Sequence, residues 1–174
     1  LSILFILLNF FLINAQVTIT PSVFNVNDQI TITVSTANQS CNQLGSTPSK
    51  VYMHAGIGNE ANAFGFSVIG NWGQDDSVGL MTNNGNGTWS ITLTPSTYFG
   101  INATQQTNAT KLGMVFRNAN GSQTLKLPPA CGDFIFNIGT FRNQYLEYVP
   151  LLKESITLLV VLFMAAMSVV GDLV

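Results

Sequence analysis

Charged residues are scarce in this sequence. Only 8% of its 174 residues are charged, and six basic against eight acidic residues give a net charge of −2. This balance excludes the basic surface that nucleic-acid binding needs and the charge-rich composition of a disordered tail. The length allows one ordinary domain with a hydrophobic core.

Histidine is equally scarce, because His54 is the single histidine. A nucleophile–base arrangement would have to use it, and no nucleophile-elbow or phosphate-binding motif is present. The sequence therefore predicts a protein that is not an enzyme and needs no cofactor. Asp75 and Asp76 form an adjacent carboxylate pair. They are either a weak Ca²⁺ candidate, together with Asn71, or a solvated acidic loop.

Cys41 and Cys131 are the only cysteines. An even number of cysteines favours a disulfide in an exported chain, and the first fifteen residues, described next, predict export. Both lie among Pro, Gly, Ser or Asn residues, so we expect each at the end of a strand. Two buried free thiols are the alternative, while a zinc site would need more ligands than one histidine adds.

Both ends of the chain are strongly apolar. Residues 1–13 are nearly all Leu, Ile and Phe, and the small Ala15 follows shortly after. Residues 1–15 are therefore typical of a signal peptide and predict export, to a secreted or cell-surface location. Residues 142–174 contain an uncharged apolar run at 156–170, near the lower length limit of a membrane span. A short membrane anchor, a truncated next domain and a non-native sequence all remain open for this tail.

The middle, residues 16–141, is rich in Ser, Thr, Asn and Gln and reads as one all-β domain. Its clearer strand candidates have short alternating patterns, and its weaker candidates are shorter or less regular. The clearer ones are 29–34, 51–54, 88–93, 111–117 and 133–138, and the weaker ones are 17–20, 66–69 and 78–81. No stretch shows a helical period with caps. Seven to eight strands in this length predict an immunoglobulin-like antiparallel β-sandwich, with a jelly roll as the alternative.

Strand alternation also predicts which side chains share a face. If Val51 and Met53 point inward, Tyr52 and His54 point outward. The strands at 51–54 and 111–117 would be neighbours in an immunoglobulin-like sheet, so Arg117 would join Tyr52 and His54 in an exposed patch. Trp72 lies in a polar loop beside Asn71 and Gln74. An aromatic ring near amide and carboxylate groups suits the C–H face and hydroxyls of a sugar.

Each of these residues also has a structural interpretation. Trp72 could fold back over one end of the sandwich, and His54 could be a satisfied structural histidine. Arg117 could lie on the surface or hold the turn at residues 118–121. Trp89 falls on the inward face of its strand and is expected in the core.

Several of these motifs occur in a fixed order. They are Val51-Tyr52-Met53-His54, then Val68-Ile69-Gly70-Asn71-Trp72-Gly73, then Met81, then Asn86-Gly87-Thr88-Trp89, and finally the run from Met114 to Gly121. This order resembles the amino-terminal β-sandwich module of secreted α-amylase-family and related proteins of Bacteroidota. It is also similar, more distantly, to starch-binding carbohydrate-binding modules. The resemblance covers about residues 16–138.

The resemblance implies a secreted, non-catalytic module beside a catalytic or other domain. Carried over by position, it puts His54 and Trp72 in contact with glucan and gives Tyr52 a supporting role. No catalytic barrel follows in this chain. We therefore expect a carbohydrate-binding module for α-glucan, with a structural or adhesive spacer without a ligand as the alternative.

Overall fold

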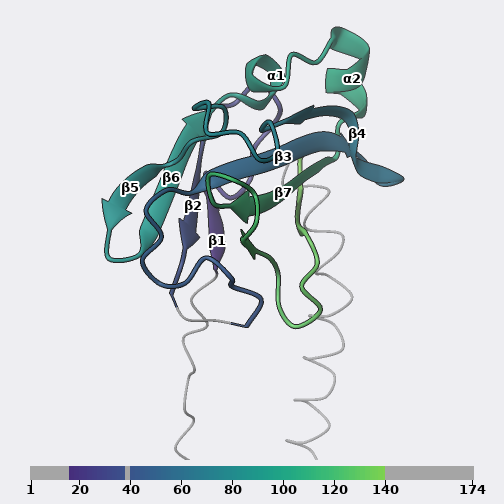
Figure 1. Ribbon diagram of the computed structural model, residues 1–174. Coiled ribbons are helices and arrows are strands. Elements are labelled where there is room, and N and C mark those ends of the chain that lie inside the picture. The colour runs from purple at the N-terminus through teal and green to yellow at the C-terminus, as the bar shows by residue number, and fades with distance from the viewer. Residues whose placement is uncertain (1–15, 38–39, 140–174) are drawn as a thin grey trace, which may run out of the picture.

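The computed structural model describes residues 16–37 and 40–139, which form two antiparallel sheets packed face to face (Figure 1). The first sheet has the spatial order β1 (Val17–Thr20), β2 (Ile30–Ser35), β6 (Thr88–Leu93) and β5 (Thr82–Gly85). The second has the order β4 (Asn62–Ile69), β3 (Tyr52–Asn59) and β7 (Lys111–Arg117), with β8 (Thr124–Leu125) and β9 (Phe134–Asn137) both pairing with β7.

The alternating patterns place the core as expected. Ile30, Ile32 and Val34 of β2 point between the sheets, where they meet Trp89 and Leu93 of β6. On the opposite sheet the core side chains are Met53, Ala55 and Ile57 of β3 and Leu112, Met114 and Phe116 of β7. Their burial removes apolar surface from water, which is the main favourable contribution to folding. Trp89 is a core residue, as predicted.

The strand order is that of an immunoglobulin-like sandwich, which confirms the predicted fold class. The first sheet corresponds to strands A, B, E and D, and the central β3–β7 pair corresponds to C and F. The described residues hold nine strands rather than seven or eight, because the last position is divided between β8 and β9. The weak strand candidate at 78–81 is wrong: Leu80 makes a single bridge to Tyr52, and β5 begins at Thr82.

The sequence showed no helical period between the ends, so it did not predict the helices that the structure contains there. Two short helices, α1 (Pro95–Tyr98) and α2 (Ala103–Asn108), link β6 to β7 and cover one end of the sandwich (Figure 1). The Asn102 side chain accepts a hydrogen bond from the Gln105 backbone, and the Gln105 side chain accepts one from the Asn102 backbone. This capping box was readable in the sequence, but α2 is too short to show a period.

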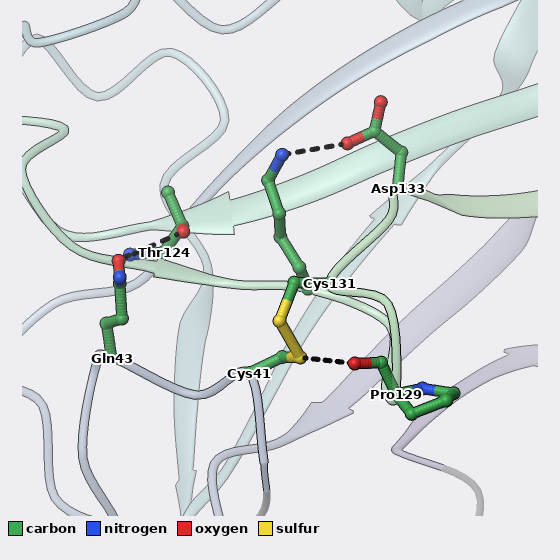
Figure 2. Close-up of a disulfide and its surroundings, with 7 residues drawn as sticks. Cys41, Gln43, Thr124, Pro129, Cys131 and Asp133 are labelled. Carbon is green, nitrogen blue, oxygen red and sulfur yellow. Dashed lines mark hydrogen bonds and ion pairs between the residues drawn. A yellow bond between two sulfur atoms is a disulfide. The ribbon is translucent and has the colours of Figure 1, made fainter.

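A disulfide joins Cys41 to Cys131, as predicted, with a Cα–Cα distance of 5.2 Å (Figure 2). It connects the segment after β2 to the loop between β8 and β9. Beside it, Gln43 exchanges backbone and side-chain hydrogen bonds with Thr124 of β8. The bridge therefore fastens a long connection to the edge of the second sheet.

The predicted signal peptide at 1–15 and the tail at 142–174 lie outside the described residues. Within the described residues, no helix has the length and apolar character needed to cross a membrane.

Candidate functional site

The candidate site lies on the outer face of the β3–β7 pair. Tyr52 is opposite Arg117 in the register, and His54 is opposite Val115. Tyr52, His54 and Arg117 therefore share one sheet face, as the sequence predicted. Residues 70–79, which we call the Trp72 loop, follow β4 and cross this face.

Arg117 is fully buried beneath the Trp72 loop. Its Nη1 and Nη2 atoms each donate two hydrogen bonds to backbone carbonyl oxygens. The acceptors are Asn118 and Ala119, both at 2.9 Å, and Asn71 and Gln74, at 2.7 and 3.1 Å. The prediction of an exposed Arg117 is wrong. Arg117 instead holds the turn that follows β7, as its structural interpretation proposed, and it holds the Trp72 loop as well.

Tyr52 is also fully buried, so its predicted exposure is wrong. The Arg117 guanidinium carbon lies 4.6 Å from the centre of the Tyr52 ring, which is a cation–π contact. The Tyr52 hydroxyl donates a hydrogen bond to Asp75 of the Trp72 loop. Strand alternation gave the correct face for Tyr52 but could not show that a loop covers that face.

Asp75 also forms an ion pair with the partly exposed Lys50. Lys50 Nζ lies 2.7 and 2.9 Å from the two carboxylate oxygens. The bonds from Lys50 and then from Tyr52 hold the pKa of Asp75 below its ordinary value. The hydrogen bond to Asp75 also raises the pKa of the Tyr52 hydroxyl, because it favours the protonated phenol. Lys50 was missed because an isolated lysine before a strand carries no motif.

Asp76 turns to different partners. The Asn71 amide donates to Asp76 Oδ2 at 2.5 Å, and the Val78 backbone donates to Oδ1 at 3.1 Å. The Asn71 bond is the main cause of a lowered Asp76 pKa. The two carboxylates therefore serve separate local contacts. Among the described residues, no three His, Cys, Asp or Glu side chains come together as a metal site.

Trp72 stands at the surface of the same face, with 47% of its area exposed. Its ring meets the His54 ring edge to face, with centroids 5.1 Å apart and planes at 88°. Gly121 supports it from another side, since a Cβ at Gly121 would come within 2.7 Å of Trp72 Nε1. These contacts therefore hold Trp72 in place while part of its ring stays exposed. Trp72 does not belong to the hydrophobic core that the described residues form.

His54 has a defined hydrogen-bond role. Its Nδ1 lies 2.6 Å from the carbonyl oxygen of Gly70. A carbonyl oxygen only accepts, so Nδ1 carries the proton, and Nε2 of the neutral ring is an acceptor. This arrangement satisfies one nitrogen structurally and leaves the other suited to a hydroxyl donor.

The structure thus brings together most of the predicted site residues but divides their roles. Trp72 and Gln74 are exposed, His54 is half-buried, and Tyr52 and Arg117 form the buried support. Asn71 is exposed, with its amide engaged by Asp76. The sequence did not predict that Lys50, Gly70 and Gly121 belong to the site. They act through backbone or surface contacts that no local pattern identifies.

No curated protein matches this sequence. A family model described as a domain of unknown function (DUF8578) matches residues 17–125. The matched region runs from β1 to the end of β8 and contains the Trp72 loop and its support from β3 and β7. It covers more than half of the chain. The chain therefore belongs to the DUF8578 family.

Proposed function

We propose that this protein is a non-catalytic carbohydrate-binding module for a neutral polysaccharide of the α-glucan class. The observation that carries the proposal is the half-exposed Trp72 ring, fixed beside the acceptor nitrogen of His54. An aromatic face stacks on the C–H face of a sugar, while a neighbouring acceptor receives a hydroxyl proton. The sequence resemblance to starch-binding modules supports the same class of ligand.

The buried support favours binding by a preformed site. Arg117 bonds to carbonyls on two sides of the Trp72 loop and on the turn after β7. Such bonds restrict the loop before a ligand arrives. Little ordering entropy is then lost on association, and this loss is one of the main costs of binding.

The charges at the site favour a neutral ligand over an acidic one. Lys50 is paired with Asp75, and Arg117 is buried beneath the loop. Asp76 adds a further carboxylate near Asn71. An acidic sugar would meet these carboxylates without an unpaired cation on the loop, so repulsion and desolvation would oppose its binding.

We place the module outside the cell, attached to a glycoside hydrolase or to another exported protein. The Cys41–Cys131 disulfide is compatible with an oxidising compartment. The low charge of the sequence and its many Ser, Thr, Asn and Gln residues suit contact with uncharged partners.

Isothermal titration of the purified module with long maltooligosaccharides tests this function. We expect measurable heat and a change in tryptophan fluorescence, with no response to an acidic polysaccharide such as polygalacturonate. Absence of any response to millimolar maltooligosaccharide would reject the α-glucan proposal.

A structural or adhesive spacer is the second candidate. The burial of Arg117 and Tyr52 favours it, because their contacts account for the folding of the Trp72 loop without a ligand. A stable monomer that binds nothing on a broad glycan array would support the spacer. Binding of any one glycan class through Trp72 would exclude it.

A further inference from the structure

A second apolar surface lies next to Trp72 on the outer face of the same sheet. Gly56 of β3 and Gly113 of β7 are directly opposite in the register. Val68 of β4 pairs with Gly56, and Ile135 of β9 pairs with Gly113. The four residues therefore lie in one row across the sheet. The glycine pair at its centre leaves a flat stretch of backbone, which we call the glycine floor, between the side chains of Val68 and Ile135.

The Phe64 ring covers the glycine floor. A Cβ on Gly56 would lie 2.3 Å from Phe64 Cδ1, and a Cβ on Gly113 would lie 2.5 Å from Phe64 Cε2. Cδ1 and Cε2 are para to one another in the ring, and they lie above β3 and β7 respectively. The ring thus lies flat across β3 and β7, which is possible only because neither strand has a side chain at that point.

An irregularity in β4 places Phe64 there. Ile57 pairs with Ser67, but Asn59 already pairs with Asn62, so Gly58 alone is opposite residues 63–66. The extra residues bend β4 over its neighbour, as bulges do. A Cβ on Gly58 would meet the Asn62 carbonyl oxygen at 1.9 Å, so this close crossing needs glycine.

The sides of this surface remain open to solvent. Val68 is 46% exposed and Ile135 is 47% exposed, so both aliphatic side chains beside the glycine pair meet solvent. Phe64 is half-buried and does not belong to the described core. Nearby cations are paired: Lys111 with Glu60 at 3.0 Å, and Lys126 with Asp133 at 3.3 Å. The surface is therefore both apolar and neutral.

This surface continues the Trp72 site. His54, which contacts Trp72, precedes Gly56 by two residues on the same face of β3. Two residues of a strand span about 7 Å. The position that contacts Trp72 and the position beneath the Phe64 ring are therefore successive outward positions of β3, and no charged side chain of β3 lies between them.

We propose that Phe64, flanked by Val68 and Ile135, is a second sugar-stacking subsite, so that the site takes an extended neutral glycan chain. This inference rests on the proposed carbohydrate-binding function. Continuity with Trp72, the flat ring and the absence of unpaired charge all fit a polymer whose successive rings present C–H faces. Short sugars occupy the Trp72 position alone, and longer chains reach Phe64 as well.

The test compares affinity across maltooligosaccharides of increasing length for the wild type, Phe64→Ala and Trp72→Ala. We expect Phe64→Ala to weaken binding of long chains about tenfold and to leave binding of the shortest ligands unchanged. Trp72→Ala should weaken every length. Leu127→Ala is the matched control, since Leu127 is 46% exposed but lies in the disulfide loop, and it should change nothing.

Gly113→Ala provides a second variant in case loss of the Phe64 ring disturbs folding. The added methyl group must displace the ring while leaving Trp72 intact, and urea unfolding shows whether the sandwich persists. We expect the same selective loss for long chains. If Phe64→Ala and Gly113→Ala both bind every length like the wild type while Trp72→Ala does not, the second subsite is rejected and the proposed function stands. If the wild type binds no glycan, both proposals fail.

Discussion

Tyr52 and Arg117 lie opposite one another on β3 and β7, and the Arg117 guanidinium carbon is 4.6 Å from the centre of the Tyr52 ring. Above this pair, the Tyr52 hydroxyl reaches Asp75, and Arg117 reaches the carbonyls of Asn71 and Gln74. The two residues thereby attach the Trp72 loop to the sheet from below. The exposed part of the candidate site depends on this buried pair.

Replacing Arg117 with Met should lower the free energy of unfolding by about 3 kcal/mol or more. The change leaves four carbonyl oxygens without their donor, and a hydrogen bond to a charged group contributes about 1.5–3 kcal/mol. Urea unfolding measures the loss. Lys126→Met is the control, because it removes a partly exposed cation just after β8 and should cost less than about 1 kcal/mol. Equal losses in the two variants would contradict the structural role of Arg117.

Asp75 and its two partners, Lys50 and Tyr52, which we call the Asp75 cluster, should contribute stability that depends on pH. Lys50 and Tyr52 lower the pKa of Asp75 from its ordinary 3.8, so the folded state favours the carboxylate. The contribution is therefore complete above the unfolded pKa and is lost as the pH falls below 3.8, through the lower pKa of the folded state. Asp75→Asn should reduce the slope of unfolding free energy against pH in this acid range.

The Asp75 cluster should also make stability fall as the pH rises in the alkaline range, which is the opposite direction to its effect in acid. Asp75 raises the pKa of both Lys50 and Tyr52 in the folded state. Their contribution is present below the ordinary values of 10.5 and 10.0 and is lost as the pH rises through the higher folded values. Asp75→Asn should reduce this loss, although burial still raises the pKa of Tyr52. Asp28→Asn, in the turn before β2, should leave the loss unchanged. A wild-type pH profile retained in Asp75→Asn would refute the assignment.

The disulfide should contribute strongly to stability. Cys41 and Cys131 are separated by 90 positions, and closing a loop of that length restricts the unfolded chain by about 4 kcal/mol. The Cys41→Ser/Cys131→Ser double variant should unfold at a correspondingly lower urea concentration. A reductant should shift the wild type toward the double variant and leave the double variant unchanged. If the variant and the oxidised wild type unfold together, the bridge has no stabilising role.

Trp72→Ala should weaken α-glucan binding by about 1–3 kcal/mol, because an exposed stacking ring is lost. The stability of the fold should change little, since Trp72 lies outside the described core. Titration calorimetry with long maltooligosaccharides measures the affinity, and urea unfolding provides the control. Undiminished affinity in this variant would place the binding surface elsewhere.

The sequence was sufficient for the fold class because its signals are local and repeated. Alternation in β2, β6 and β7 predicted which side chains enter the core, and the sandwich confirmed it. The disulfide also followed from two cysteines in a chain expected to be exported. The short α2 was missed because six residues cannot show a helical period, although Asn102 and Gln105 carried the capping signal.

By itself, the sequence predicted the sandwich, the inward faces of the main strands and the common face of Tyr52, His54 and Arg117. Side-chain alternation follows from strand geometry, and the predicted immunoglobulin-like order makes the strands at 51–54 and 111–117 neighbours. Only the tertiary structure decided which of these residues meets solvent. The Trp72 loop returns across the sheet and buries Tyr52 and Arg117, and the irregular β4 brings Phe64 over Gly56 and Gly113. Both outcomes depend on contacts between segments distant in sequence, which no local pattern encodes.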